Sequence, residues 1–172
     1  ASADIVVMTE KAQLTIDTTG KDGAADDAAK LGICHVVAKD DKEAMEQVRK
    51  LLAVLPSNNL AGAPVFESSD SAEAALAAGA DAKKVVEAIS DKGSFVELNS
   101  AFGTSAVTGL AQIDGSTVGI VALNGVLDAD SCSKAARFVR FCDAFSIPVV
   151  TLVDAKEFTS VREAAKLSNA YS

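Results

Sequence analysis

The sequence of 172 residues is poor in aromatic side chains, proline and histidine. It contains no tryptophan, only 5% aromatic residues in all, three prolines and a single histidine. Hydrophobic residues nevertheless make up 49% of the chain, so its core must be built mainly from alanine, valine and leucine. This composition favours alanine-rich helices packed closely on a sheet.

Two classes of protein are disfavoured by what the sequence lacks. No apolar run reaches the roughly 18 residues that a membrane-spanning helix needs. With 16 basic against 24 acidic residues, the net charge of −8 leaves no basic footprint for nucleic acid. A local group of basic residues can still bind an anion on such an acidic protein.

The residues that usually build metal, disulfide or nucleophile sites are also scarce. Cys34, Cys132 and Cys142 are odd in number and lie in apolar surroundings, which predicts reduced core residues of a cytosolic protein. His35 has no Cys, Asp or Glu at metal-ligand spacing, so we expect no metal site and a strand histidine, in the core or at the surface. The serine-nucleophile elbow and the glycine-rich nucleotide loops are absent as well.

A β-hairpin is predicted in the second half of the chain. Residues 107–113 and 117–123 are apolar runs that flank Asp114 and Gly115. Asp-Gly supplies the positive φ angles of a tight type I′ turn, so the two runs should pair antiparallel. The second run is apolar on both faces apart from Thr117, which is typical of a strand covered on both sides.

A helix over residues 132–145 is predicted to follow the hairpin. Asp128 and Asp130 are interpreted as its N-caps rather than as an acid–base pair. One face is apolar at three- and four-residue steps, with Ala135, Ala136, Val139, Cys142 and Phe145. The other face is expected in solvent and carries Lys134, Arg137 and Arg140, the two arginines being surface charges or, alternatively, ligands of CoA phosphates.

The run VVTLV after Pro148 predicts a buried parallel strand that becomes polar at Asp154. Together with the hairpin and the helix, it predicts one β-α-β crossover. Ligands of parallel sheets gather at the ends of the strands, so this end is the place to look for a site.

The first part of the chain carries weaker patterns. Residues 5–8 and 14–16 predict a first hairpin, residues 33–38 a strand, and residues 42–54 a helix capped by Asp41. The inward stripe of that helix is expected to consist of Met45, Val48, Leu52 and Leu55. Residues 60–71 have the composition of a linker, Asp81 is expected to cap another helix, and residues 160–171 predict a last one.

A series of short stretches carries a resemblance to one known family. They are VTG at 107–109, IDG at 113–115, VGIVA at 118–122, GVLD at 125–128, KAARF at 134–138, RFCDAF at 140–145, IP at 147–148 and LVD at 152–154. GSFVEL at 93–98 and LPSNN at 55–59 extend the resemblance upstream. In this order they resemble the biotin-dependent carboxyltransferases, the family of acyl-CoA carboxylase β-subunits and sodium-pump decarboxylase α-subunits.

The resemblance implies an α/β fold of the crotonase-like (ClpP/crotonase) type, built of ββα units. Residues 1–59 would be the rear of the N-terminal lobe, residues 60–80 a linker, and residues 81–172 the front of the C-terminal lobe. The chain would then be the central portion of a family member.

The resemblance also implies a site at the turn after the VGIVA strand. Backbone amides of Leu123, Asn124 and Gly125 would form an oxyanion hole for an enolate. Substrate or biotin would contact Ala122, Val126, Asp154 and Phe158. The sequence departs from the family here, because it lacks the N-Q-P of the turn and has D-A-K-E-F at 154–158 in place of D-V-P-G-F.

The implied function is transfer of CO2 between biotin and an acyl-CoA, in a carboxylase or in a decarboxylase, the latter slightly favoured. Biotin would be attached to a carrier protein or domain, and no metal is expected. Expected partners are a biotin carrier protein, with a biotin carboxylase or membrane decarboxylase subunits, and further copies of the chain. We expect a cytoplasmic protein, or one held at a membrane by a partner. Two alternatives stay open: a non-catalytic structural subunit of the same fold, and a crotonase-type enoyl-CoA hydratase or isomerase.

Overall fold

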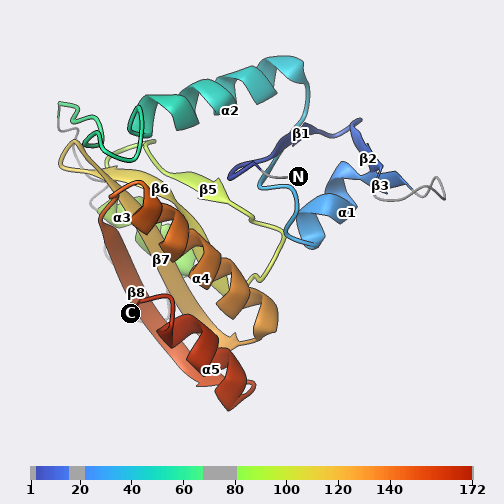
Figure 1. Ribbon diagram of the computed structural model, residues 1–172, viewed down its shortest axis with the longest axis vertical. Helices are drawn as coiled ribbons and strands as arrows, with labels where there is room; N and C mark the ends of the chain where they lie inside the picture. The colour runs from blue at the N-terminus through green and yellow to red at the C-terminus, as the bar shows by residue number, and fades with distance from the viewer. Residues whose placement is uncertain (1–2, 16–21, 68–80, 172) are drawn as a thin grey trace.

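The computed structural model describes residues 3–15, 22–67 and 81–171 (Figure 1). Its largest element is a four-stranded sheet in the order β5-β6-β7-β8. The strands are β5 (Val96–Leu98), β6 (Ala106–Ile113), β7 (Ser116–Leu127) and β8 (Val149–Phe158). β6 is antiparallel to both β5 and β7, whereas β8 is parallel to β7.

The predicted hairpin is confirmed in β6 and β7. Asp114 and Gly115 both have positive φ, 50° and 73°, as a type I′ turn requires. Ile113 therefore lies opposite Ser116, and the ladder continues without a break to Ala106 opposite Leu123. The local turn chemistry sets the register of the centre of the sheet.

Helices cover both faces of this sheet, as the apolar β7 predicted. Val121 and Leu123 pack toward α4 (Ala129–Ala144), while Ile120 and Ala122 pack on the other face with Val86 of α3 (Ala82–Ile89). Figure 1 shows α4 in front of the sheet and α3 behind it. The β7-α4-β8 order is the expected crossover.

The N-terminus and the packing of α4 follow from its sequence. Asp128 is the N-cap, and its Oδ1 accepts the Ser131 N–H at 2.8 Å, a bond that lowers the pKa of this carboxyl. Gly119 of β7 lets the helix approach closely, because a Cβ there would lie 2.5 Å from the Cys142 Sγ. Burial raises the pKa of the Cys142 thiol to about 12.

The predicted first hairpin is wrong. β1 (Val7–Thr9) pairs in parallel with β4 (Val36–Ala38), and β2 (Gln13–Thr15) pairs antiparallel with β3 (Asp22–Ala24), which leads into α1 (Ala25–Lys30). Residues 9–11 contain no glycine or asparagine for a tight hairpin turn, so partners farther along the chain take both strands. Ile16, the end of the predicted second strand, lies outside the described residues.

The helix predicted over 42–54 is α2 (Asp41–Val54), but its cap and its buried stripe differ from expectation. Asp40, not Asp41, is the N-cap and accepts the Glu43 N–H at 2.9 Å. Leu51 and Val54 are buried, whereas Met45 and Leu52 of the predicted stripe are 54% and 67% exposed. Leu55 of the predicted stripe is partly buried and packs against the same core as Leu51 and Val54, so the prediction is right at this end of the helix only.

The core links the first and last parts of the chain. Leu51 and Val54 of α2 belong to the same buried cluster as Leu98, Phe138 and other residues of the sheet and α4. The proposed lobe boundaries at 59 and 80 stay a prediction. Much of the proposed linker, residues 68–80, lies outside the described residues.

The described part of that linker contacts the hairpin. Val65 forms an isolated bridge with Ser116, and the Phe66 N–H donates to the Gly115 carbonyl at 2.8 Å. Asp81 caps α3 as predicted, accepting the Lys83 N–H at 3.1 Å. The last helix, α5 (Val161–Ser168), is shorter than the predicted 160–171. Among the helices of the described ranges, none combines the length and apolarity needed to cross a bilayer.

Candidate functional site

The predicted site lies at the carboxyl ends of the parallel strands β7 and β8. In register, Asn124 lies opposite Asp154 and Gly125 opposite Ala155. The turn expected at 122–125 is absent, because β7 continues as a strand to Leu127. It is held there by β8 on one side and by the bond from the Asn124 N–H to the Ser105 carbonyl on the other, 2.9 Å long.

The residues expected at this site divide into buried and exposed ones. Ala122 and Leu123 are 2% and 5% exposed and lie within the strand interior. The side chains of Asn124, Val126, Asp154 and Phe158 are exposed at the strand ends. The structure thus brings the exposed members together on one edge, but it leaves the first two inside the sheet.

Gly125 is the irregular point of this edge. Its φ is 65°, and the ladder shifts register between Gly125 and Val126, so that Lys156 of β8 is the additional residue of a bulge. A Cβ at Gly125 would meet no atom within 4 Å. Bulges interrupt the regular backbone pairing, so this is the part of the predicted site where open space and an irregular backbone coincide.

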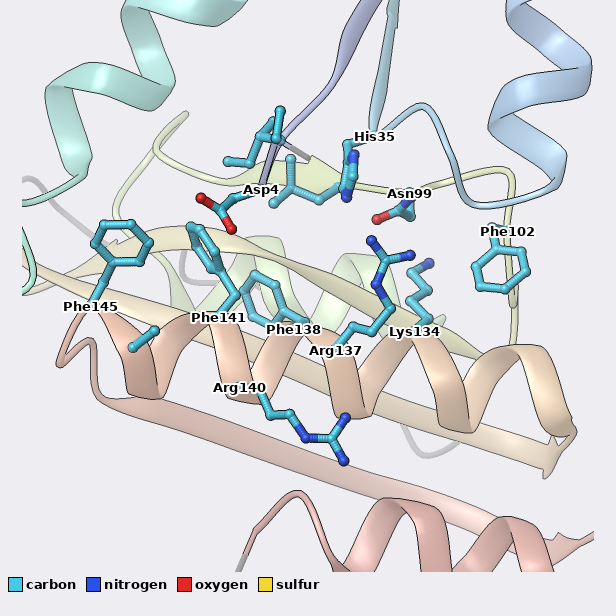
Figure 2. Close-up of a pocket in the computed structure, with 14 residues that line it drawn as sticks. Asp4, His35, Asn99, Phe102, Lys134, Arg137, Phe138, Arg140, Phe141 and Phe145 are labelled. Carbon is cyan, nitrogen blue, oxygen red and sulfur yellow. The ribbon is translucent and has the colours of Figure 1, made fainter. Parts of the chain in front are cut away.

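A cavity of about 320 Å³ lies elsewhere, between the first residues of the chain and α4 (Figure 2). His35 and the segment of Leu98, Asn99 and Phe102 contribute to its walls. None of the seven residues predicted at the strand ends lines it, whereas Arg137 and Arg140, considered as alternative ligands of CoA phosphates, do. Sequence reasoning did not identify this cavity, since its walls come from four separate segments.

Lys134 corrects the prediction that the basic face of α4 lies in solvent. The residue is only 4% exposed, and burial lowers the pKa of its amine to about 8. Arg137 is exposed at the cavity, and its Nη1 donates to the Gly32 carbonyl at 3.3 Å. Arg140 is exposed, as predicted. The sequence did contain a pattern that indicates this wall of the cavity. Basic and aromatic residues follow one another at helical spacing on one side of α4, namely Lys134, Arg137, Phe138 and Phe141.

His35 is half-buried at the cavity, on the residue before β4. Its Nδ1 accepts the Val6 N–H at 3.1 Å, so the proton of the neutral ring lies on Nε2. Burial lowers the pKa of His35, the Arg137 charge lowers it further, and Asp4 opposes both. The imidazole is therefore neutral at physiological pH.

The described residues contain free cysteines and no cluster of metal ligands. Cys34, Cys132 and Cys142 are buried free thiols, as predicted, and burial raises the pKa of each. Across residues 3–15, 22–67 and 81–171, no three His, Cys, Asp or Glu side chains gather as metal ligands would.

Comparison with known proteins gives consistent matches. The model of the carboxyl transferase domain matches residues 6–165. The propionyl-CoA carboxylase beta chain of Saccharopolyspora erythraea is 37% identical over 87% of this chain and 34% of its own length. The methylmalonyl-CoA decarboxylase subunit alpha of Veillonella parvula is 34% identical over 82% of this chain and 33% of its own.

Solved structures agree with these matches. The transcarboxylase 12S subunit, crystallised as a hexamer with hydrolysed methylmalonyl-coenzyme A, superposes with a TM-score of 0.87 at 32% identity. The match covers 98% of this chain and 41% of the 12S chain. The expected α/β crotonase-like fold is thereby confirmed. The chain spans about a third of the length of the two sequence relatives, and it belongs to the carboxyl transferase domain family.

Proposed function

We propose that the full-length protein containing this chain transfers a carboxyl group between biotin and an acyl-CoA. The observation that carries the proposal is the family match over residues 6–165, joined to a TM-score of 0.87 with transcarboxylase 12S. The relatives include carboxylase and decarboxylase subunits, so both directions of transfer are within the proposal.

The chemistry would take place at the carboxyl ends of β7 and β8. Removing or adding CO2 at the carbon beside a thioester places negative charge on the thioester oxygen. Backbone N–H groups fixed before the reaction stabilise such charge without reorganising. We assign this role to the amides around the Gly125 bulge rather than to Asn124, whose N–H is already donated to Ser105 at 2.9 Å.

The surroundings of the bulge fit the fused bicyclic ring of biotin, which has an apolar thioether ring and a polar ureido group. Val126 and Phe158 are 43% and 40% exposed, and the space beside Gly125 is free of atoms within 4 Å of a Cβ position. Asp154, exposed opposite Asn124, offers a hydrogen-bond acceptor. When bound, biotin would supply or receive the carboxyl group, and these residues would orient it.

Biotin would reach the site on a carrier protein or domain. Partners would then be that carrier and a biotin carboxylase or membrane decarboxylase subunits. Copies of the chain would assemble together, since the related 12S subunit is described as a hexamer within a multienzyme core. We place the protein in the cytoplasm or at a membrane through such a partner.

A non-catalytic structural subunit is the second candidate, and one observation favours it. Two predicted site residues, the contact residue Ala122 and the oxyanion residue Leu123, are buried, and the Asn124 amide is occupied. A hydratase or isomerase would need glutamates at the candidate site. Glu157, exposed opposite Val126, lies at this edge.

The test is an assay of the full-length protein with a biotinylated carrier and methylmalonyl- or malonyl-CoA as carboxyl donor, or with a carboxybiotinylated carrier as donor and propionyl-CoA as acceptor. We expect acyl-CoA-dependent carboxylation or decarboxylation that is abolished when avidin sequesters the biotin. Absence of biotin-dependent turnover in the assembled complex would favour the structural subunit. Avidin-resistant hydration of an enoyl-CoA would instead establish the hydratase.

A further inference from the structure

The cavity beside α4 has walls of two kinds. Phenylalanines form one side. The ring centroids of two of them, Phe138 and Phe141, are 6.2 Å apart. Lys134, Arg137 and His35 form the other. The cavity shares no residue with the β7–β8 edge, so it is a second site, independent of the carboxyl-transfer proposal.

Two cations of α4 face this space. Figure 2 shows the side chains of Lys134 and Arg137 extending from α4 toward His35 and Asn99, whereas Arg140 extends away from them. Lys134 and Arg137 are one helical turn apart, so both can contact one ligand. Only Asp4, which is exposed, contributes an acidic side chain to the described lining.

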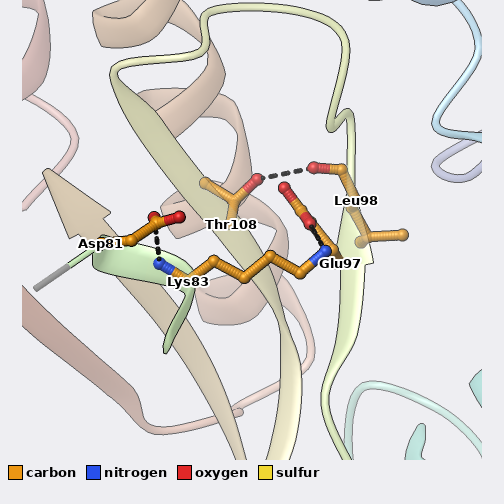
Figure 3. Close-up of polar contacts among 5 residues, drawn as sticks. All are labelled: Asp81, Lys83, Glu97, Leu98 and Thr108. Atoms are coloured by element: carbon orange, nitrogen blue, oxygen red, sulfur yellow. Dashed lines mark hydrogen bonds and ion pairs between the residues drawn. The ribbon is translucent and has the colours of Figure 1, made fainter. Parts of the chain in front are cut away.

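Lys134 is buried without an ion-pair partner among the described residues. Glu97 is the carboxylate whose charge raises the pKa of Lys134, but its Oε2 is paired with the Lys83 Nζ at 2.8 Å (Figure 3). A buried ammonium that lacks a counter-charge is costly to the folded protein. An anion bound in the cavity would remove that cost.

The remaining walls specify the rest of the ligand. Phe145 extends the pair of rings along α4, with its centroid 5.0 Å from that of Phe141, whereas Phe102 lies at the other end of the cavity, near Lys134 (Figure 2). The volume of about 320 Å³ is at the lower end of the range of about 300–1,000 Å³ found for ligand pockets.

Three cations belong to the lining, but only Lys134 and Arg137 extend into the space, since Arg140 extends away (Figure 2). These two carry two positive charges, Asp4 carries one negative charge and His35 is neutral. A small molecule with a single negative charge and an apolar body fits this balance.

We propose that this cavity binds a small organic carboxylate, with its carboxylate held by Lys134 and Arg137 and its apolar body against the phenylalanines. The carboxylate would accept hydrogen bonds from the ammonium and the guanidinium. The family match does not enter the proposal, which rests on the cavity walls alone.

The probe is phenylacetate, titrated calorimetrically into the full-length protein, with the neutral phenylacetamide as its matched control. We expect saturable binding of phenylacetate and at least tenfold weaker binding of phenylacetamide. Lys134→Met and Arg137→Gln should each weaken the binding of phenylacetate at least tenfold. Arg137 is exposed, so its substitution does not put the fold at risk. Lys84→Met, an exposed lysine of α3 on the opposite face of the sheet, should leave the affinity within twofold.

Each contrary outcome overturns the proposal. Absence of saturable phenylacetate binding would show that the cavity is closed or filled in the full-length protein. Equal binding of phenylacetamide, or unchanged affinity in both Lys134→Met and Arg137→Gln, would show that the cations do not bind the ligand. Inorganic phosphate that binds as tightly as phenylacetate would show a plain anion site without a role for the phenylalanines.

Discussion

Asp91 binds the hairpin turn at Gly115 through its buried carboxylate. The Asp91 Oδ2 accepts the Gly115 N–H at 2.9 Å, and Oδ1 accepts the Asp114 N–H at 3.0 Å. Asp91 is 4% exposed, so these bonds are shielded from water. The turn that sets the register of β6 and β7 is therefore fixed from outside the hairpin as well as by its own Asp-Gly sequence.

Asp91→Ala is expected to lower the free energy of unfolding by about 1–3 kcal/mol, because the buried Gly115 N–H and the part-buried Asp114 N–H lose their acceptors. Urea denaturation of the wild type and the variant measures this change. Asp143→Ala, an exposed aspartate of α4, is the control and should change stability by less than about 0.5 kcal/mol. Equal effects of the two substitutions would contradict the role given to Asp91.

Gly119→Ala is expected to destabilise the protein by about 1–3 kcal/mol through overpacking. The added Cβ would lie 2.5 Å from the Cys142 Sγ and 3.2 Å from Phe138, so α4 would have to move away from the sheet. The control is Gly62→Ala, where an added Cβ meets no atom within 4 Å. Thermal denaturation compares the two, and an unchanged Tm for Gly119→Ala would refute the close packing of α4.

Lys134 should make stability rise with pH on the alkaline side. Its pKa is lowered from 10.5 to about 8 in the folded protein, so between these values the unfolded chain holds a proton that the folded chain has released. When the unfolded state binds more protons, the free energy of unfolding increases with pH. Below pH about 8, Lys134 is charged in both the folded and the unfolded state, and the folded state bears the full cost of the buried ammonium.

The measurement is urea denaturation of the wild type and Lys134→Met at pH 7, 9 and 10.5. The difference in stability between them should shift in favour of the wild type as pH rises, since the variant lacks the titrating group. Lys84→Met, which removes an exposed lysine, should follow the wild type. Parallel pH profiles of wild type and Lys134→Met would show that Lys134 is solvated.

Phe158→Ala should lower kcat/KM for carboxyl transfer by about tenfold, because loss of one apolar contact surface costs about 1–1.5 kcal/mol of binding. Its side chain is 40% exposed, so the buried remainder should also contribute to stability, and urea denaturation separates that loss from the effect on kcat/KM. Val161→Ala, at an 87% exposed position of α5, serves as the control and should retain kcat/KM. Wild-type kcat/KM in Phe158→Ala would remove this residue from the proposed site.

The elements that the sequence predicted correctly are those decided by neighbouring residues. The Asp114-Gly115 turn and the cap at Asp128 act over a few positions, and the structure contains both. The partner of β1 depended on residues nearly 30 positions away, which no local pattern reveals.

Burial was harder to predict than secondary structure. On α2 the sequence offers two apolar stripes, and only packing against the sheet selects Leu51 and Val54 over Met45 and Leu52. On α4, basic residues one helical turn apart predict a solvent-exposed face. Lys134 is nevertheless buried, because other parts of the chain cover it. The exposed edge of the candidate site could be predicted because it lies at the ends of predicted strands. The extension of β7 to Leu127 could not, because it depends on pairing with β8.

Because Leu51 and Val54 share a buried cluster with Leu98 and Phe138, the beginning and end of the chain should melt together. A weakening substitution in α2, such as Leu51→Ala, should then lower the protection of β6 and β7 amides against hydrogen exchange as well as that of α2. α2 would thus stabilise the sheet that carries the candidate site.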